Sequence, residues 1–291
     1  MSVCVLDHPE FLKGEHALIV LDLDGTLLRS DKTISDFTKQ AICKAKDCGY
    51  TIVIATGRHP KSALRYLEDL DCLNEKSCAI CFNGAAQLLM QDYIKAADEI
   101  NFPVLNACYA SGEEAIEIAK FAHKYACKVH AYSRDRGLLI EDLNPHTLRE
   151  INHGQVGYTA VDFEKLDKNE RFFKILIVGE ASDLNKLRDY VPEEFKQHFE
   201  VMRSDANFLE FIPGPSTKGT ALKALCESIN LPLVQAVAFG DAENDLDMLK
   251  TAGLGIAMEN ADEYVKSQYH IFTASNDEDG VGKAILKLIS K

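Results

Sequence analysis

Short apolar runs alternate with segments of helical periodicity in the first part of the chain. Three runs have the length and the branched residues of buried parallel strands, at residues 17–22, 51–55 and 77–82. Two segments between them have the apolar spacing of helices, at about 35–48 and 60–70. Gly49 is placed to end the first of these helices in the left-handed conformation. This order predicts a parallel sheet with crossover helices.

The pattern changes after Asn83-Gly84. We expect a hairpin formed by residues 87–90 and 93–97 around Gln91-Asp92. A helix at about 112–125 follows, with one apolar face made by Ala115, Ile118, Ala119 and Ala122. Further short elements alternate up to residue 212: strands near 127–133, 136–140, 156–162, 171–178, 198–203 and 207–212, and helices near 145–152 and 182–190. The middle of the chain therefore predicts an α+β domain with mostly antiparallel pairing.

The α/β pattern resumes at about residue 213. It predicts helices at 217–229, 244–251, 261–267 and 280–290, and strands at 234–239, 254–257 and 269–273. We therefore expect residues 1–85 and 213–291 to form one α/β domain, into which residues 86–212 are inserted as a second domain. The hinges are expected near Asn83-Gly84-Ala85 and Pro213-Gly214-Pro215, where glycine and proline concentrate.

Composition and charge narrow the class of protein. The 291 residues are 46% hydrophobic and 26% charged, which is ordinary for a globular protein. No apolar run approaches the roughly 20 residues that cross a bilayer. The first sixteen residues hold several charges and no sustained apolar core, so we expect a cytoplasmic protein without a secretory signal. The net charge of −13 argues against nucleic acid or an anionic membrane as a partner.

Nine cysteines scatter singly along the chain, apart from Cys78 and Cys81. These two lie in an apolar run that is predicted to be a strand, and their odd offset directs them to opposite faces. That arrangement suits neither a disulfide nor a shared metal ion, so we expect buried free thiols.

Polar clusters follow the predicted strands. Asp22-Leu23-Asp24-Gly25-Thr26 places two carboxylates and a glycine turn directly after the first strand. Ligands of open α/β sheets bind at that carboxyl edge. Two acids so close repel each other unless a cation or a proton separates them. The segment is therefore either a metal site with one nucleophilic carboxylate or a solvated acidic turn.

Three later segments favour the metal site. Thr56-Gly57-Arg58 ends the second strand, and Ser216-Thr217-Lys218-Gly219 precedes a helix. The strand at 234–239 ends in Gly240-Asp241-Ala242-Glu243-Asn244-Asp245. Together these clusters supply a hydroxyl, a lysine and further acids, which are the groups that hold a metal and a phosphate in one pocket.

The four segments, in this order, resemble the motifs of the haloacid dehalogenase superfamily of phosphatases. The long insertion between Thr56 and Lys218 looks like the large cap of its Cof-type sugar-phosphatase branch. Phe82-Asn83-Gly84-Ala85 and Phe211-Ile212-Pro213 are similar to the flanks seen there. The resemblance implies a Rossmann-like parallel-sheet core with an inserted α+β cap.

The resemblance also implies a role for each residue of the motifs. Asp22 attacks phosphorus and forms an aspartyl-phosphate, and Asp24 acts as general acid and then general base. Mg²⁺ is the expected cofactor, held by Asp22, Asp241 and the backbone carbonyl of Asp24; Asp245 either binds it directly or holds Lys218 or metal-bound water. The remaining groups, which contact the phosphoryl group or the substrate, are Thr56, Gly57, Arg58, Lys218 and Asn244. Arg58 is equally compatible with a plain surface role.

The leading hypothesis is a magnesium-dependent phosphatase for small phosphorylated metabolites, among which sugar phosphates are expected. We expect it to act as a monomer or a small homo-oligomer. A phosphomutase of the same superfamily is the alternative enzyme. A phospho-accepting regulatory module is a third reading, against which Asp24 speaks because such a module needs no catalytic acid. Substrate contacts in the cap are expected among His130, Tyr132, Arg134, His146 and Lys174, and Lys174 stands out because it interrupts an apolar run, although an edge position facing solvent would also explain it.

Overall fold

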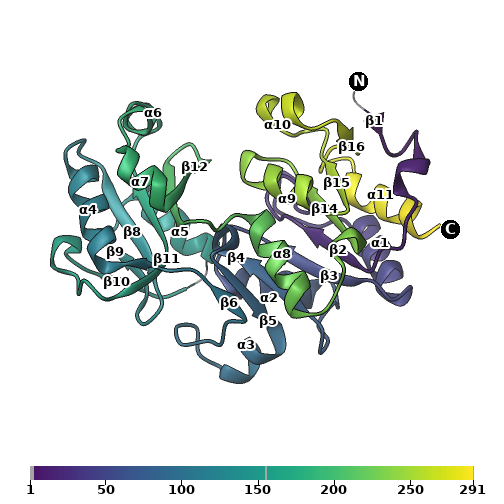
Figure 1. Ribbon diagram of the computed structural model, residues 1–291, viewed down its shortest axis with the longest axis horizontal. Helices are drawn as coiled ribbons and strands as arrows, with labels where there is room; N and C mark the ends of the chain where they lie inside the picture. Colours follow the sequence, from purple (N-terminus) through teal and green to yellow (C-terminus); the bar gives the residue numbers. More distant parts are fainter. Residues whose placement is uncertain (1–2, 155, 291) are drawn as a thin grey trace.

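The computed structural model describes residues 3–154 and 156–290 of the chain, which form two lobes built on separate sheets (Figure 1). The larger sheet has nine strands in the order β1-β16-β15-β14-β2-β3-β4-β5-β6. Its strands run parallel from β1 to β4, and only β5 and β6 are antiparallel to their neighbours. The predicted α/β core with an inserted α+β domain is confirmed. The core strands are β1 Val3–Cys4, β2 Leu18–Leu21, β3 Thr51–Ala55, β4 Cys78–Cys81, β5 Ala86–Leu89, β6 Asn106–Ala107, β14 Ala236–Gly240, β15 Leu254–Ala257 and β16 Ile271–Phe272.

Helices cover both faces of the core sheet. Successive residues of β2 bury their side chains on opposite faces, since Ile19 packs with one apolar cluster and Leu18 with another. The first cluster includes residues of α1 (Asp36–Asp47), α2 (Pro60–Asp69) and α11 (Gly280–Ile289). The second includes residues of α8 (Lys218–Ser228), α9 (Leu246–Thr251) and α10 (Glu263–Gln268). This three-layer arrangement leaves the carboxyl edge of the sheet open for a site.

Cys78 and Cys81 are buried free thiols on opposite faces of β4, as the sequence predicted. Gly49 follows α1 with φ of 93°, the left-handed conformation expected of it. Ser35 begins that helix, because its side chain accepts a hydrogen bond from the backbone N–H of Thr38.

The segment after Asn83-Gly84 differs from the prediction. The expected hairpin is wrong, because residues Met90–Ala96 form helix α3, which buries Met90 and Tyr93 one turn apart. β5 pairs instead with β4, and β6 pairs with β5, so both strands extend the core sheet. A four-residue strand such as Ala-Gln-Leu-Leu fits either sheet, and only the pairing partner decides its place. We therefore propose that the inserted domain begins after β6 rather than at residue 86, and that its first hinge lies near residues 108–109.

The smaller sheet belongs to the inserted domain, which we call the cap. Its order is β10-β9-β8-β11-β13-β12, with β7 also paired to β11, and all pairs except β9 with β10 are antiparallel. One face packs on α4, whose Ala115, Ile118, Ala119 and Ala122 are buried as predicted. The other face shares a cluster with the core through side chains such as Phe173 and Leu176. The cap elements are β7 Ala110–Ser111, α4 Gly112–His123, β8 Lys128–Ser133, β9 Gly137–Ile140, α5 Pro145–Gly154, β10 Tyr158–Ala160, β11 Arg171–Val178, α6 Ala181–Asp189, α7 Glu193–His198, β12 Phe199–Asp205 and β13 Phe208–Pro213.

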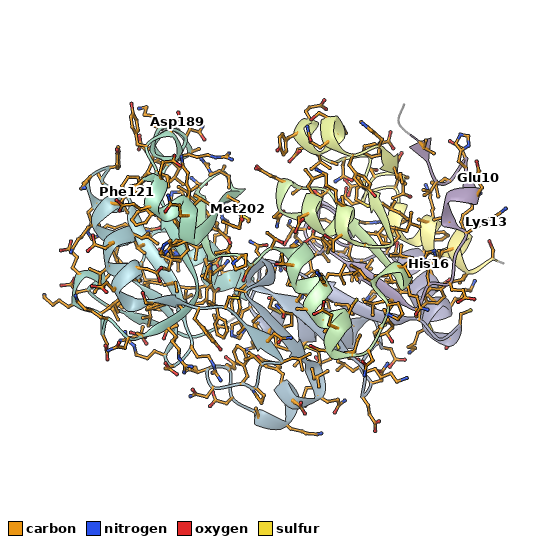
Figure 2. All side chains as sticks on the ribbon, viewed as in Figure 1. Glu10, Lys13, His16, Phe121, Asp189 and Met202 are labelled. Carbon is orange, nitrogen blue, oxygen red and sulfur yellow. The ribbon has the colours of Figure 1, made fainter. Side chains whose placement is uncertain are left out.

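The N-terminal segment adds an edge strand to the core, since β1 pairs with β16. Its labelled side chains Glu10, Lys13 and His16 lie at the opposite end of the molecule from Phe121 of the cap (Figure 2). The segment is therefore remote from the boundary between the two lobes. Within the described residues, no helix has the length and apolar character needed to cross a membrane.

Candidate active site

The four polar segments meet at the carboxyl edge of the core sheet. Asp22, Thr56 and Asp241 each follow directly on one of the three adjacent parallel strands β2, β3 and β14. Lys218 is the first residue of α8 and is buried. Because parallel strands end at the same edge, the order of the strands alone brings three of these segments together.

Lys218 lies between two carboxylates. Its Nζ donates to Asp22 Oδ1 at 2.6 Å and to Asp245 Oδ1 at 2.7 Å. Burial alone would lower the pKa of Lys218, but the two carboxylates raise it above its ordinary value. The lysine is therefore a fixed positive charge beside the predicted nucleophile.

Asp245 also organises its own loop. Its Oδ2 accepts the backbone N–H of Asp241 at 3.0 Å and that of Ala242 at 3.1 Å. Both of its oxygens are thus engaged, one by Lys218 and the other by the loop.

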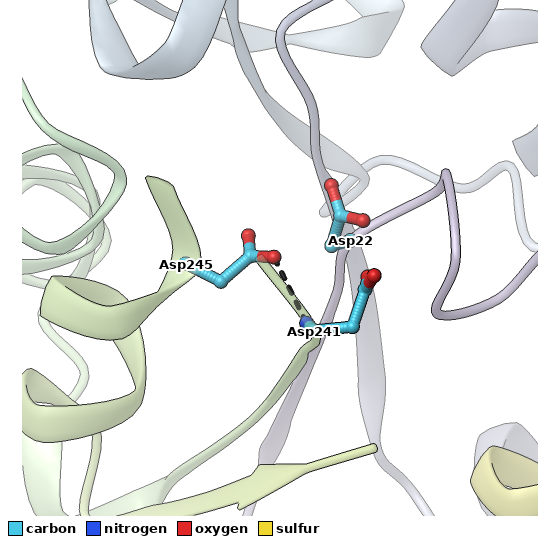
Figure 3. A group of neighbouring side chains, drawn as sticks. All are labelled: Asp22, Asp241 and Asp245. Carbon is cyan, nitrogen blue, oxygen red and sulfur yellow. Dashed lines mark hydrogen bonds between the residues drawn. The ribbon is translucent and has the colours of Figure 1, made fainter. Parts of the chain in front are cut away.

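Three acids share one small volume. Carboxylate oxygens of Asp22, Asp241 and Asp245 lie within 4.8 Å of one another, and Figure 3 shows these side chains together, with Asp22 and Asp241 just beyond β2 and β14 and Asp245 on the short helix that follows. Burial, with the charge of Asp245, raises the pKa of Asp22 well above its ordinary value, although Lys218 opposes this. The same two causes raise the pKa of Asp241 to about 7. One lysine does not balance three acids, so the group has the charge and the oxygen donors that a hard divalent cation needs.

Two neighbours fix the side chain of Asp241. Thr26 Oγ1 donates to Asp241 Oδ1 at 2.6 Å. Gly25 has φ of 82°, and a Cβ there would lie 2.2 Å from Asp241 Oδ2. The glycine of the first motif is therefore required both for its left-handed backbone and for the close approach of this acid.

Asp24 is held in its ionised form. Arg58 donates to both of its oxygens, from Nε at 2.8 Å and from a terminal nitrogen at 2.6 Å, and Lys32 Nζ donates at 2.9 Å. Burial acts to raise the pKa of Asp24, but these hydrogen bonds outweigh it and lower the pKa to about 2. The Arg58 side chain is only 13% exposed, so a plain surface role does not describe it.

The second strand end supplies a buried hydroxyl. Thr56 Oγ1 accepts the backbone N–H of Arg58 at 3.2 Å, which leaves the hydroxyl hydrogen to be donated to a group in the cavity that Thr56 lines. A Cβ on Gly57 would lie 2.9 Å from the amide of Asn83, so only glycine permits this close contact.

A cavity of about 360 Å³ connects these groups with the cap. Its core side includes Asp22, Asp24, Thr56, Arg58 and Asn244. Its cap side is formed by two acids, a lysine and two aromatic residues, namely Glu150, Glu210, Lys174, Tyr132 and Phe208. The cavity therefore presents charge and hydrogen-bonding groups from both lobes to one ligand.

Of the five cap candidates, Tyr132 and Lys174 line this cavity. The other three bond elsewhere within the described residues: buried His130 to Thr147, Arg134 to the carbonyls of Ile100 and Phe102, and His146 to Glu180. Burial lowers the pKa of His130 to about 4.

Lys174 lies on a central strand of the cap sheet, so an edge position does not explain it. Its Nζ donates to Glu210 Oε1 at 3.1 Å and lies 3.6 Å from Glu150 Oε1. Burial alone would lower the pKa of Lys174, but these charges raise it above its ordinary value. Glu210 was not singled out from the sequence. It interrupts an apolar run, Phe208 to Ile212, as Lys174 does, and that signal could have found it. The contact of Lys32 with Asp24 could not be found in this way, because Lys32 does not interrupt an apolar run.

The comparisons with known proteins agree with this geometry. A family model described as haloacid dehalogenase-like hydrolase matches residues 19–285. The 5-amino-6-(5-phospho-D-ribitylamino)uracil phosphatase YitU of Bacillus subtilis is 29% identical, with 94% of this chain and 97% of that protein covered. The pyridoxal phosphate phosphatase YbhA of Escherichia coli is also 29% identical, covering 92% and 97% respectively.

A solved structure extends the match to three dimensions. It is a haloacid dehalogenase-like hydrolase from Bacteroides thetaiotaomicron, 28% identical, with a TM-score of 0.79 over 94% of this chain and 100% of that one. The chain therefore belongs to the haloacid dehalogenase-like hydrolases, and it is an enzyme, a phosphatase of this family, as its motifs predicted.

Proposed function

We propose that this enzyme is a magnesium-dependent phosphatase that hydrolyses small phosphorylated metabolites through an aspartyl-phosphate on Asp22. One observation carries the proposal. Lys218 contacts both Asp22 and Asp245 at a buried sheet edge beside Asp241, and Asp22 lines a cavity shared with the cap. A carboxylate with a fixed cation beside it can attack phosphorus while the cation disperses charge on the phosphoryl oxygens.

The other motif residues act on the same phosphoryl group. The buried hydroxyl of Thr56 and the side-chain amide of Asn244 supply hydrogen-bond donors at the cavity wall. Asp24 protonates the leaving oxygen in the first step and takes a proton from water in the second. Its ionised state, set by Arg58 and Lys32, is the form that the second step needs. Before the first step, the substrate must displace Arg58 and Lys32 from Asp24, so that this carboxylate can take up a proton from solvent and pass it to the leaving oxygen.

The acid cluster fits Mg²⁺. Asp22 and Asp241 would hold the ion, together with the backbone carbonyl of Asp24, because these are oxygen donors on a rigid sheet edge. Asp245 is better suited to hold Lys218 and the 241–245 loop, since both of its oxygens already accept hydrogen bonds. When bound, the ion would neutralise charge on the phosphate and orient it toward the nucleophile.

The cap side of the cavity contacts the leaving group. Its acids, lysine and tyrosine suit a leaving group with several hydroxyl groups, such as a sugar or a polyol. The two phosphatase relatives are named for a phosphoribityl compound and for pyridoxal phosphate, and these names support a small phosphorylated metabolite as the substrate.

The test is hydrolysis of p-nitrophenyl phosphate, followed by a panel of sugar, nucleotide and cofactor phosphates. We expect turnover that depends on Mg²⁺, stops with EDTA and returns when Mg²⁺ is restored. An Asp22→Asn variant that remains folded should show no turnover. Absence of turnover by the folded wild-type protein with Mg²⁺ present would refute the proposal.

A further inference from the structure

Three buried polar residues that line the cavity join the cap to the core. Asn83 follows β4 in the core, whereas Glu210 and Lys174 lie on the cap strands β13 and β11. Asn83 Nδ2 donates to Glu210 Oε2 at 2.9 Å, and Lys174 Nζ donates to Glu210 Oε1 at 3.1 Å. Each of the three is at most 3% exposed. Buried polar groups are kept only where each finds a partner, so this set specifies one arrangement of the two lobes.

The set also reaches the loops that carry the motif residues. Lys174 Nζ donates to the carbonyl of Gly57 at 3.0 Å, between Thr56 and Arg58. Asn244 Nδ2 donates to Asn83 Oδ1 at 3.0 Å, which connects the loop that follows β14. One buried amide therefore contacts the cap through its nitrogen and the metal-site loop through its oxygen.

The backbone at Asn83 has an unusual conformation that directs this amide toward its partners. Phe82, Asn83 and Gly84 have φ of 52°, 55° and 106°, so two residues with side chains occupy the left-handed region in succession. Such conformations persist only where the surroundings hold them, and they concentrate at functional sites. Here the backbone N–H of Asn83 donates to the carbonyl of Thr56 at 3.1 Å, and that of Phe82 to the carbonyl of Arg58 at 3.2 Å.

The partners of Asn83 decide which way its side-chain amide is oriented. A carboxylate engaged by a lysine can only accept, so the nitrogen of Asn83 must face Glu210 and its oxygen must face Asn244. A carboxylate at position 83 would meet the carboxylate of Glu210 and break the contact. An amide at position 210 would restore it, because that amide could donate to a carboxylate at position 83.

We propose that Asn83, Glu210 and Lys174 are positioning residues that hold the 56–58 and 241–245 loops in their reactive arrangement when the cap is closed. The inference rests on the proposed phosphatase function for its kinetic part. A displacement of about 1 Å in groups that contact the transition state can cost roughly 100-fold in rate. Loss of the contact therefore lowers kcat more than it raises KM.

The experiment compares the wild-type protein, Asn83→Asp, Glu210→Gln and the double variant. Readouts are kcat and KM with p-nitrophenyl phosphate and Mg²⁺, the melting temperature, and backbone hydrogen exchange of peptides that cover residues 54–58 and 240–246. Asn83→Asp should lose about 10- to 100-fold in kcat, change KM by less than about threefold, and exchange faster in both peptides. The double variant should recover most of the lost kcat and the slow exchange.

Glu170→Gln is the matched control, because Glu170 forms another cap ion pair, with Arg136 at 2.5 Å, and does not line the cavity in the described part of the chain. It should leave kcat unchanged. If Asn83→Asp does not fold, Asn83→Gly replaces it, since glycine accepts the left-handed backbone and removes only the amide.

Three results would overturn the proposal: wild-type kcat in folded Asn83→Asp, a double variant no better than that single variant, or an equal loss in Glu170→Gln. Hydrogen exchange is independent of activity. If the wild-type protein hydrolyses no ester, the proposed function fails, yet faster exchange in Asn83→Asp that the double variant reverses still supports the positioning of the loops. If hydrogen exchange in Asn83→Asp is also the same as in the wild-type protein, the positioning of the loops by Asn83 is overturned.

Discussion

Replacement of Lys218 by methionine removes the only positive charge that contacts Asp22 and Asp245 among the described residues, while keeping most of the apolar side chain. Both carboxylates are buried, and the Lys218 side chain is fully buried between them. Carboxylate oxygens of this cluster lie within 4.8 Å of one another, which corresponds to a repulsion of roughly 3 kcal/mol at an effective dielectric constant of about 20. Loss of one partner from a buried ion pair costs about 3–5 kcal/mol. We therefore expect the variant to lose about 3–5 kcal/mol of unfolding free energy in EDTA.

Urea unfolding followed by far-UV circular dichroism measures this loss. The measurement is made at about pH 8, above the pKa of about 7 to which burial and Asp245 raise Asp241 in the wild-type protein. Mg²⁺ should recover part of the stability, because a divalent cation also compensates the carboxylates. Lys223→Met is the control, since Lys223 is exposed on the same helix α8 and its loss should cost less than about 0.5 kcal/mol. A loss below about 1 kcal/mol for Lys218→Met in EDTA would refute the electrostatic account of the site.

Three further predictions concern the acids and the cap. Asp22→Asn removes the nucleophile together with a buried charge whose pKa is raised, so turnover should vanish while the melting temperature stays at or above the wild-type value; a clear drop in melting temperature would contradict this. Asp24→Asn should lower kcat by roughly two to four orders of magnitude and let a phosphorylated protein accumulate, visible by intact mass spectrometry; an unchanged kcat would place the acid elsewhere. His123 bonds to Glu141 at 2.5 Å and to Glu164 at 2.9 Å, and although burial opposes this, these contacts raise its pKa above the ordinary 6.5. Because the folded-state pKa is the higher one, the ion pairs stabilise the cap below about pH 6.5 and their contribution disappears as pH rises through the folded-state value. His123→Gln should therefore lower the melting temperature at about pH 5.5 and much less at about pH 8.5, and equal losses would exclude the ion pairs as the cause.

The core and the meeting of the motif segments could be predicted from sequence because both depend on local patterns. Buried parallel strands are continuous apolar runs, and the residue after each run lies at the same sheet edge. Asp22, Thr56 and Asp241 follow such runs, so their proximity required only the strand order. The helix start at Lys218 was visible for a similar reason, since Thr217 is an ordinary N-cap.

The contacts between the lobes could not be predicted in this way. The bond of Asn83 to Glu210 joins residues 127 positions apart, and nothing in the chain near either residue identifies the other. The short sequence of β5 suits a cap strand as well as a core strand, so its pairing with β4 had to be observed. Arg58 was equally compatible with solvent, because the turn that directs it toward Asp24 depends on the neighbouring loop at residues 82–83.

The electrostatics of the site explain why these contacts are needed. Asp22, Asp241 and Asp245 crowd one buried volume with a single lysine among them in the described part of the chain, an arrangement that costs stability when no cation is bound. A fold tolerates such a cluster only if its backbone is held from several sides, here by Asp245 on its own loop, by Thr26 on Asp241, and by Asn83 on Asn244. The same shortage of positive charge favours a divalent cation and an attacking carboxylate. Stability lost at this edge and reactivity gained there therefore have one cause, and substitutions that relieve the repulsion should stabilise the protein as they abolish turnover.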